Sequence, residues 1–477
     1  MRLLAEDLDF RAIREEFALP AGYPERARAE ATAATDRYAE GRRDATDIPF
    51  VTIDPPGSRD LDQAVHVERT AGGHRVHYAI ADVGALVEPG SALETESLRR
   101  GQTVYLPDGS VPLHPVELSE GTASLLPDEV RPAAVWVVDV DEEGETTAAT
   151  VARATVRSRA RLDYAGVQAD ADSGRLHPSI AELPVVGERL RRRGVRAGAI
   201  TLRLPAQEVA RTDSGWELRI EPRVAADEWN AQISLLVGRA AAGLMIGAGV
   251  GLLRTLPPVD ARTVEALHVD ARALHLTWPE GAGVGEMLDS VDPNTPAGLA
   301  MMRVATKALR GAEYRLVTPD DAGPDGTGAA PDAGHAGIGG PYAHVTAPIR
   351  RVADRYATEV CLAVCAGTPV PEHVLARLPE LPGLMQSSDR AAAAVDRACV
   401  DYAEAVALRH RVGDRCEVVV LRAATGSRPA EAFLAEPPVF GDCTGDAEVG
   451  TSVPATVAEV DVAARRIRFD VAPPDGR

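Results

Sequence analysis

The chain has 477 residues, a formal net charge of −20 and a pI near 5.1. This acidic balance argues against broad, non-specific adhesion to nucleic acid or anionic membranes, although it is compatible with a local basic groove. Hydrophobic residues at 45% and charged residues at 26% are typical of a soluble globular protein with two or three domains, and they exclude general disorder.

Cysteine usage and apolar stretches indicate the compartment. The five cysteines form no C-x-x-C pair and no Cys/His zinc spacing, which is typical of reduced thiols in a cytosol. The start, MRLLAEDLDF, becomes acidic before any apolar region develops, and the longest uncharged apolar stretch, Ala240–Leu253, is too short to span a bilayer. We therefore expect a cytoplasmic protein that does not bind membranes.

Residues 1–45 are expected to form a short helical N-terminal segment. Helical periodicity runs over Arg11–Phe17 and Glu25–Tyr38, and Pro and Gly residues separate the two.

The stretch Ile48–Val65, IPFVTIDPPGSRDLDQAV, follows and carries three close carboxylates. Its first residues predict a buried strand ending in a turn, so Asp54 can fold back towards Asp60 and Asp62, which point to one side of an extended segment. Such a group would suit one or two hard divalent cations. A solvated acidic loop is the alternative.

Strand-like patterns then alternate with helical ones. Strands are expected at 76–83, 103–107 and 133–141, and a helical region with a basic cluster at 160–196, whose simplest interpretation is a solvated helix face. Two further strands, AITLRLPAQEV and WELRIEPRV, precede a long amphipathic helix at about 226–246. A Gly/Pro/Asp-rich segment between 318 and 340 predicts a mobile surface insertion.

The segment YAHVTAPIRRVADRYATEV predicts a helix that begins with Thr346 as N-cap. Arg350 and Arg351 would then lie in the first turn, where cations are unfavourable unless an anion is bound, so they suggest a phosphate. A surface Arg350–Asp354 pair is the alternative.

A helix is expected at about 387–410, and short strands and turns follow Val412. Residues 411–477 therefore predict a small, reduced β-barrel of OB type.

Taken together, these blocks resemble the ribonuclease II (RNB) family of exoribonucleases. Thr52-Ile53-Asp54 and Asp60-Leu61-Asp62-Gln63 are similar to the family's TID and D-x-D-D signatures, and YAHVTAPIRR is similar to its Y-x-H-x-T-S-P-I-R-R segment. The resemblance implies an α/β fold, with an RNB-type catalytic domain at 46–410, made of a mixed sheet surrounded by helices, and an OB-fold-like RNA-binding barrel at 411–477.

The resemblance also implies an activity: metal-dependent 3′→5′ hydrolysis of single-stranded RNA to nucleoside 5′-monophosphates by a monomer. It assigns catalysis to Asp62, Arg350 and Asp60, and Mg²⁺ or Mn²⁺ binding to Asp54, Asp60, Asp62 and Gln63. The RNA-binding residues that it implies are Tyr105, Asn230, Gln232, His344, Thr346 and Arg351. Tyr105 would pack on the 3′-terminal nucleotide, with a structural tyrosine as the alternative.

Departures from the family pattern qualify these expectations. Gln63 stands in place of a fourth aspartate, so one anionic ligand is replaced by a neutral amide. Trp229-Asn230-Ala231-Gln232 replaces the family's LIEE, which leaves Asn230 or Gln232 to bond a ribose 2′-OH. Leu202 takes the approximate place of a base-clamping aromatic, and the 45 N-terminal residues are too few for two cold-shock-like barrels.

These departures leave three hypotheses: the exoribonuclease, a catalytically silent RNA-binding or regulatory relative, and a metal phosphodiesterase acting on DNA or small nucleotides. We further expect arginines such as Arg192, Arg193, Arg350 and Arg351 to line a buried channel that offsets the net negative charge.

Overall fold

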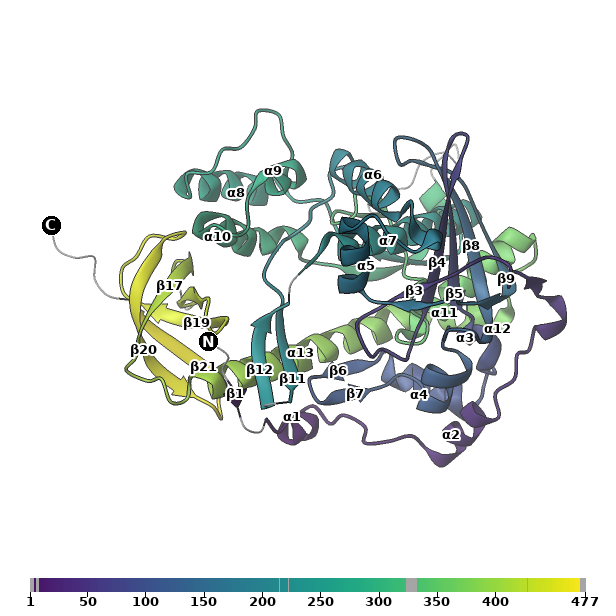
Figure 1. Ribbon diagram of the computed structural model, residues 1–477, viewed down its shortest axis with the longest axis horizontal. Coiled ribbons are helices and arrows are strands. Elements are labelled where there is room, and N and C mark those ends of the chain that lie inside the picture. The colour runs from purple at the N-terminus through teal and green to yellow at the C-terminus, as the bar shows by residue number, and fades with distance from the viewer. Residues whose placement is uncertain are drawn as a thin grey trace.

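The structure, a computed structural model, describes residues 4–5, 8–213, 215–221, 223–322, 333–426 and 428–471. A larger body with a β-sheet between helices and a smaller β-barrel lie side by side along the long axis of the molecule (Figure 1). Residues 323–332, the middle of the predicted surface insertion, lie outside the described residues.

The central sheet of the larger body has five strands in the order β2-β9-β8-β5-β4. They are β2 (Arg43–Asp44), β9 (Thr146–Arg157), β8 (Val130–Val140), β5 (Gly73–Ala81) and β4 (Gln63–Thr70). All neighbours are antiparallel except β2 and β9, so the sheet is mixed, as the sequence predicted. Val76, Tyr78 and Ile80 pack on one face, and Ala79 and Ala81 on the other. Both faces are therefore buried.

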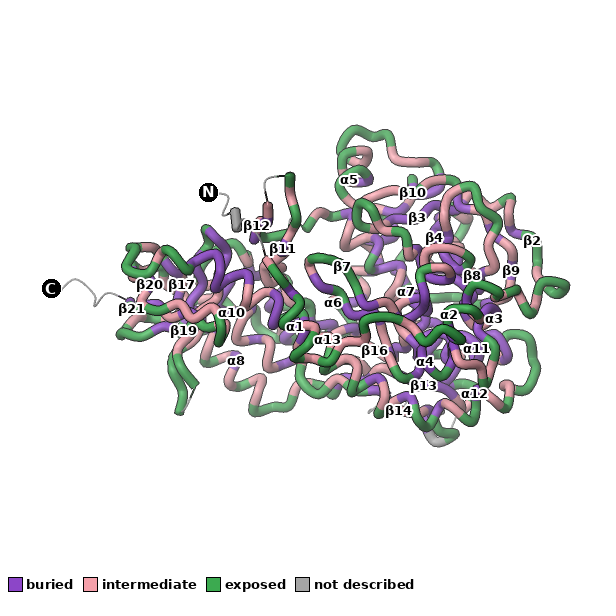
Figure 2. Tube along the Cα trace, turned by 90° about the horizontal axis from the view of Figure 1, so that it is seen from below, coloured by how far each residue is buried: buried purple, intermediate pink, exposed green. Residues whose placement is uncertain are grey.

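Helices cover both faces of the sheet. The first face packs against α6 (Leu183–Arg196), α7 (Ala225–Ala248) and α11 (Val352–Ala366), and the second against α2 (Glu25–Thr32), α3 (Val83–Leu86) and α4 (Ala92–Arg100). The buried segments accordingly gather around the sheet, α7 and α11 (Figure 2).

Helix α7 is, among the described residues, the one helix long and apolar enough to cross a membrane by length and composition alone. Half of its most apolar window is buried inside the molecule. Its predicted apolar stripe packs into the core through Ile233, Leu236 and Val237, which have no exposed surface. Its apolar character is thus used in the core of the larger body.

Helix α13 (Leu381–Leu408) runs from the larger body to the barrel (Figure 1). The hairpin of β11 (Gln207–Thr212) and β12 (Gly215–Ile220) packs beside it, and β1 (Leu4–Ala5) adds a third strand to that hairpin. Phe10 fixes this junction, because its ring makes edge contacts with Trp216 at 5.6 Å and Tyr402 at 5.8 Å between ring centroids.

The C-terminal barrel is closed in the order β17-β18-β19-β21-β20, which confirms the predicted OB type. Its strands are β17 (Arg415–Arg422), β18 (Ala430–Leu434), β19 (Val439–Thr444), β20 (Ser452–Asp461) and β21 (Arg466–Val471). Strand β19 was not predicted, because Gly441 and Asp442 resemble a turn. Gly441 is needed there, since a Cβ would lie 2.7 Å from the ring of the buried Phe469.

The remaining elements connect these parts. They are α1 (Arg11–Glu16), α5 (Tyr164–Asp172), α8 (Ala261–Ala273), α9 (Val284–Ser290), α10 (Pro296–Ala305), α12 (Glu372–Arg377), β3 (Thr52–Ile53), β6 (Val104–Leu106), β7 (Gly109–Val111), β10 (Arg161–Leu162), β13 (Gly251–Thr255), β14 (Glu313–Val317), β15 (Gly334–His335) and β16 (Gly340–Pro341). The strand expected at AITLRLPAQEV is wrong for its first eight residues, 199–206, which are loop, and β11 begins only at Gln207.

The helix expected from Thr346 begins later, at Val352 with Arg351 as N-cap. The buried Asp354 is the reason: its carboxylate accepts the backbone N–H of Ala347 at 2.8 Å and the Nε of Arg351 at 2.6 Å, which folds the preceding loop against the first turn. Asp354 thus pairs with Arg351, whereas the alternative pair Arg350–Asp354 does not form.

Candidate functional site

A pocket of about 840 Å³ lies between the β3–β4 loop, β6, α7 and the loop before α11. We call it the site pocket. It brings together seven of the predicted site residues: Asp54, Gln63, Tyr105, Asn230, Thr346, Arg350 and Arg351. Four others do not line it: Asp60, Asp62, Gln232 and His344.

Asp62 lies behind the wall of the site pocket and binds Arg350. Its carboxylate has no exposed surface and accepts the backbone N–H of Ile349 and the Nε of Arg350, both at 2.7 Å. Burial raises the pKa of Asp62 to about 7, while Arg350 and the Ile349 N–H act in the opposite direction. The pair joins two segments that lie almost 290 residues apart in sequence.

Arg350 presents the rest of its guanidinium to the site pocket. Only its Nε is hydrogen-bonded to another described residue, so both NH₂ groups remain available. Asp62, Tyr105 and Asp60 all raise the pKa of Arg350, which keeps it charged. A held guanidinium with two vacant donor groups is suited to bidentate binding of a phosphate.

Asp54 follows β3 directly and carries an unsatisfied oxygen. Its Oδ2 is buried without a hydrogen-bond partner among the described residues. Burial raises the pKa of Asp54 to about 6; Arg350 lowers it and Asp60 raises it further. An orphaned carboxylate oxygen in a pocket wall costs free energy unless a cation or donor binds it, so Asp54 fits a hard metal ion.

Replacing Asp54 by Asn should remove a pH-dependent loss of folding stability. Because the folded-state pKa lies near 6, above the ordinary 3.8, the folded protein holds the proton more tightly than the unfolded chain. The wild type should therefore lose up to about 2–3 kcal/mol of stability relative to Asp54→Asn as pH rises from about 4 to 6. Urea unfolding across this range measures the difference. A constant difference between the two proteins would contradict the prediction, and above pH 6 Mg²⁺ or Mn²⁺ should stabilise only the wild type.

Asp60 and Tyr105 form a second contact at the entrance. The Tyr105 hydroxyl donates to Asp60 Oδ2 at 3.0 Å, and Tyr105 is 51% exposed. A tyrosine with half of its surface exposed contributes little to a core, which argues against the structural alternative and leaves its ring free to stack on a base.

Gln63, predicted as a metal ligand, is instead engaged by hydroxyls. Its Oε1 accepts hydrogen bonds from Tyr78 and, at 3.1 Å, from Ser234 Oγ. Both lone pairs of the amide oxygen are thus used, so coordination of a metal by Gln63 would displace at least one of these hydrogen bonds. In the described part of the chain, no group of three or more Asp, Glu, His or Cys side chains could hold a metal. The residues fit a metal bound by one or two carboxylates with its other ligands from water and substrate, as Mg²⁺ commonly is.

The two predicted amides of α7 face different ways. Asn230 lines the site pocket, whereas Gln232 lines another cavity and donates to Glu228 Oε1 at 2.7 Å. Side chains that are two residues apart on a helix point about 200° apart around its axis, so Asn230 and Gln232 cannot both reach one nucleotide. Of the two alternatives for a 2′-OH contact at the site pocket, Asn230 is the one in place.

His344 also differs from expectation. It is half-buried, its Nδ1 lies 2.6 Å from the Tyr314 hydroxyl, and desolvation lowers its pKa well below the ordinary value. Its ring packs edge-on against Tyr342 at 5.3 Å between centroids, and Tyr342 lines the site pocket. His344 thus does not line the site pocket and contacts Tyr342 from behind its wall, and direct RNA contact by His344 stays a prediction.

Several residues of the site pocket were not predicted from the sequence. They include Gln102, Tyr164, Asp227, Ser234, Tyr342 and Asp396. Tyr342 is the first residue of the YAHVTAPIRR segment, whereas the others come from segments whose spacing carries no motif, so that only the fold brings them together. The channel expected from four arginines is half right: Arg350 and Arg351 line the pocket, but Arg192 is paired with Glu188 and Arg193 with Glu145.

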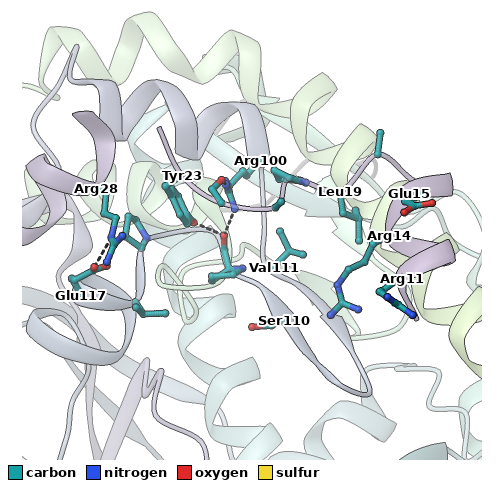
Figure 3. Close-up of a pocket in the computed structure, with 17 residues that line it drawn as sticks. Arg11, Arg14, Glu15, Leu19, Tyr23, Arg28, Arg100, Ser110, Val111 and Glu117 are labelled. Carbon is teal, nitrogen blue, oxygen red and sulfur yellow. Dashed lines mark hydrogen bonds and ion pairs between the residues drawn. The ribbon is translucent and has the colours of Figure 1, made fainter. Parts of the chain in front are cut away.

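A larger cavity, about 880 Å³, lies between the N-terminal segment and the β6–β7 hairpin (Figure 3). None of the predicted site residues lines it. Its arginines are all in ion pairs, namely Arg11–Asp9, Arg14–Asp108, Arg28–Glu117 and Arg100–Glu96. It therefore lacks available cations for an anionic ligand.

Comparisons with known proteins place these features in context. The RNB domain profile matches residues 42–365, and the RNase II-type exonuclease C-terminal S1 domain profile matches residues 414–472. The chain is 26% identical over 399 residues to the exosome complex exonuclease dis3 of Schizosaccharomyces pombe, covering 80% of this chain and 40% of the relative. It is 27% identical over 427 residues to ribonuclease R of Aquifex aeolicus, covering 84% of this chain and 58% of the relative. The chain thus spans less than two thirds of either relative.

Solved structures share the fold. Mycoplasma genitalium RNase R in complex with ribose methylated single-stranded RNA superposes with a TM-score of 0.85 at 18% identity, covering 97% of this chain and 77% of that chain. Yeast Ssd1, described as a pseudonuclease, superposes with a TM-score of 0.67 at 17% identity, covering 89% of this chain and 54% of that chain. The same fold is thus found in a ribonuclease and in a pseudonuclease.

Proposed function

Since this chain belongs to the RNB-domain family, we propose that it is a metal-dependent exoribonuclease that hydrolyses single-stranded RNA from the 3′ end to nucleoside 5′-monophosphates. The observation that carries the proposal is the Asp62–Arg350 pair, because it holds a guanidinium whose NH₂ groups have no partner among the described residues in the same pocket wall as Asp54. The sequence similarity to ribonuclease R and to an exosome exonuclease supports it.

In this proposal each pocket residue has a separate task. The NH₂ groups of Arg350 bind the non-bridging oxygens of the scissile phosphate and stabilise the negative charge that grows during displacement. Asp62 fixes the direction of that guanidinium through Nε. Tyr105 stacks on the 3′-terminal base, and Asn230 bonds its ribose.

The carboxylates complete the site. Asp54 and Asp60 would hold a divalent metal, with Asp62 behind them; a bound Mg²⁺ or Mn²⁺ supplies charge neutralisation at the phosphate and activation of water. The pKa of Asp54, raised to about 6, leaves its carboxylate mostly ionised at neutral pH, where it can bind a cation or accept a proton.

A second candidate, the catalytically silent RNA-binding relative, is favoured by one observation. The amide oxygen of Gln63 is bonded to Tyr78 and Ser234, so the fourth position of the acidic cluster contributes neither charge nor a vacant lone pair. The fold shared with a pseudonuclease is compatible with this reading.

Digestion of a 3′-labelled single strand tests both candidates. With Mg²⁺ or Mn²⁺ the label should be released as a mononucleotide. EDTA should stop the release, because without a metal ion the site pocket has too few positive charges to stabilise the displacement at the phosphate. A matched DNA strand should be cut more slowly, since it lacks the 2′-OH that Asn230 would bond. Binding of RNA without release in either metal would favour the silent relative, and equal cutting of DNA would favour the general phosphodiesterase.

A further inference from the structure

Helix α7 separates the site pocket from another cavity of about 470 Å³, here called the α7 cavity. The stripe Glu228, Gln232, Leu235 and Arg239, spaced at one helical turn, faces the α7 cavity. Leu235 also lines the site pocket, so the two spaces adjoin across one side chain. The volume of the α7 cavity falls in the range of about 300–1,000 Å³ that is typical of small-molecule sites.

Arg239 is the unusual residue of the α7 cavity. It is half-buried in the cavity wall, and it makes no hydrogen bond or ion pair with any described residue. Burial and the neighbouring Arg193 lower its pKa to about 10, and Glu145 only partly offsets them; the guanidinium is still charged at neutral pH. A half-buried guanidinium that faces a cavity and has no carboxylate partner among the described residues keeps its donors available for an anion, and its planar fork favours phosphate.

A second cation strengthens this reading. Arg203 also lines the α7 cavity and has no carboxylate partner among the described residues. Its Nη2 donates to the carbonyl oxygens of residues 288, 289 and 291, at 2.9, 2.9 and 2.6 Å, which fixes its position without neutralising its charge. The arginines of the cavity in Figure 3, by contrast, are all paired with carboxylates.

Gln232 adds a neutral group of defined orientation. Because its Nε2 donates to Glu228 Oε1, its Oε1 must point the other way and is an acceptor without a partner in the described part of the chain. Two guanidinium groups and one amide oxygen match a phosphate and a sugar hydroxyl, the two polar parts of a nucleotide.

We propose that the α7 cavity is a second nucleotide-binding subsite, in which Arg239 and Arg203 bind a phosphate and Gln232 accepts a ribose hydroxyl. This subsite deepens the proposed exoribonuclease function and rests on it. The phosphate has two sources of the same chemistry: the backbone of the strand next to the cleaved end, or a released nucleoside 5′-monophosphate.

The test measures binding in EDTA, so that no hydrolysis interferes. The probes are adenosine 5′-monophosphate and a single-stranded RNA oligomer without terminal phosphates, titrated into the full chain and into Arg239→Gln. The control is Arg192→Gln, because Arg192 carries the same charge on neighbouring α6 but is exposed, paired with Glu188 and absent from the cavity wall. Thermal melting accompanies each titration.

Arg239→Gln should weaken binding of at least one probe about tenfold, the value of a charge-assisted hydrogen bond, and Arg192→Gln should leave both unchanged. If the cavity binds a backbone phosphate, Arg239→Gln should weaken binding of the oligomer alone, and the slope of log K against log salt concentration should be smaller by about 0.7. If the cavity binds a product nucleotide, Arg239→Gln should weaken binding of adenosine 5′-monophosphate. The melting temperature of Arg239→Gln should not fall, because the substitution breaks no hydrogen bond or ion pair with a described residue.

Unchanged affinity of Arg239→Gln for both probes would overturn the subsite, and so would wild-type protein that binds neither. These results are separate from the fate of the nuclease. A chain that binds the probes as expected but never releases nucleotides refutes the nuclease and retains the subsite. A working nuclease whose Arg239→Gln variant binds like wild type refutes the subsite alone.

Discussion

Asp62→Asn should abolish release of mononucleotides from a 3′-labelled RNA strand, with a fall in rate of at least about 10²–10³-fold. Asn has nearly the same shape and can still accept the N–H of Ile349, so the loop before α11 should keep its position. It carries no charge, however, so Arg350 loses the carboxylate that directs its guanidinium into the site pocket. Single-turnover digestion in Mg²⁺ measures the loss at the chemical step.

Binding provides the control for this variant. The affinity for RNA in EDTA should change little, because Tyr105 and Asn230 remain in the pocket wall. Glu117→Gln, which removes one carboxylate from the unrelated cavity of Figure 3, should leave the rate unchanged. Undiminished digestion by Asp62→Asn would remove the catalytic assignment of this pair.

The sequence predicted the fold class because its strands and helices carry strong periodic patterns. The strands around Tyr78 and Trp136 are apolar on both faces, as expected for a sheet covered by helices on each side. Predictions failed where a contact distant in sequence overrides local propensity. Gly441 reads as a turn, yet the ring of Phe469 requires a residue without Cβ in β19. Thr346 reads as an N-cap, yet the Asp354 carboxylate delays the helix to Val352.

The sequence predicted which residues belong to the site, but it did not predict which residues they contact. Spacing placed Asp54, Asp60 and Asp62 together and suggested a shared metal, whereas in the structure Asp60 accepts from Tyr105, Asp62 binds Arg350, and Asp54 Oδ2 has no partner among the described residues. No local pattern links Asp62 to Arg350, because the pairing depends on how α11 docks against the sheet. The unpaired Arg239 carried no signal in the sequence, since the absence of a partner is a property of three-dimensional surroundings alone.

Arg350→Gln should damage both activity and stability, in contrast to Asp62→Asn. The asymmetry follows from exposure: the Arg350 side chain is 35% exposed, whereas that of Asp62 is fully buried. Removing the aspartate leaves a cation that water can reach, but removing the arginine leaves a buried carboxylate without a counter-charge, which costs about 3–5 kcal/mol. Nucleotide release should fall about 10²–10³-fold, because the phosphate loses its charged donor.

The stability loss of Arg350→Gln should depend on pH. Burial already raises the pKa of Asp62 to about 7, and without Arg350 the carboxyl should hold its proton to still higher pH. A folded-state pKa above the unfolded value means that stability is retained at low pH and lost as pH rises through the folded-state value. Urea unfolding should therefore find Arg350→Gln close to wild type near pH 5 and weakest above pH 8. The double variant Asp62→Asn/Arg350→Gln, which removes both charges, should recover most of that stability loss at pH 8. If Arg350→Gln is instead destabilised equally at pH 5 and pH 8, its stability loss comes from lost packing and not from the buried carboxylate.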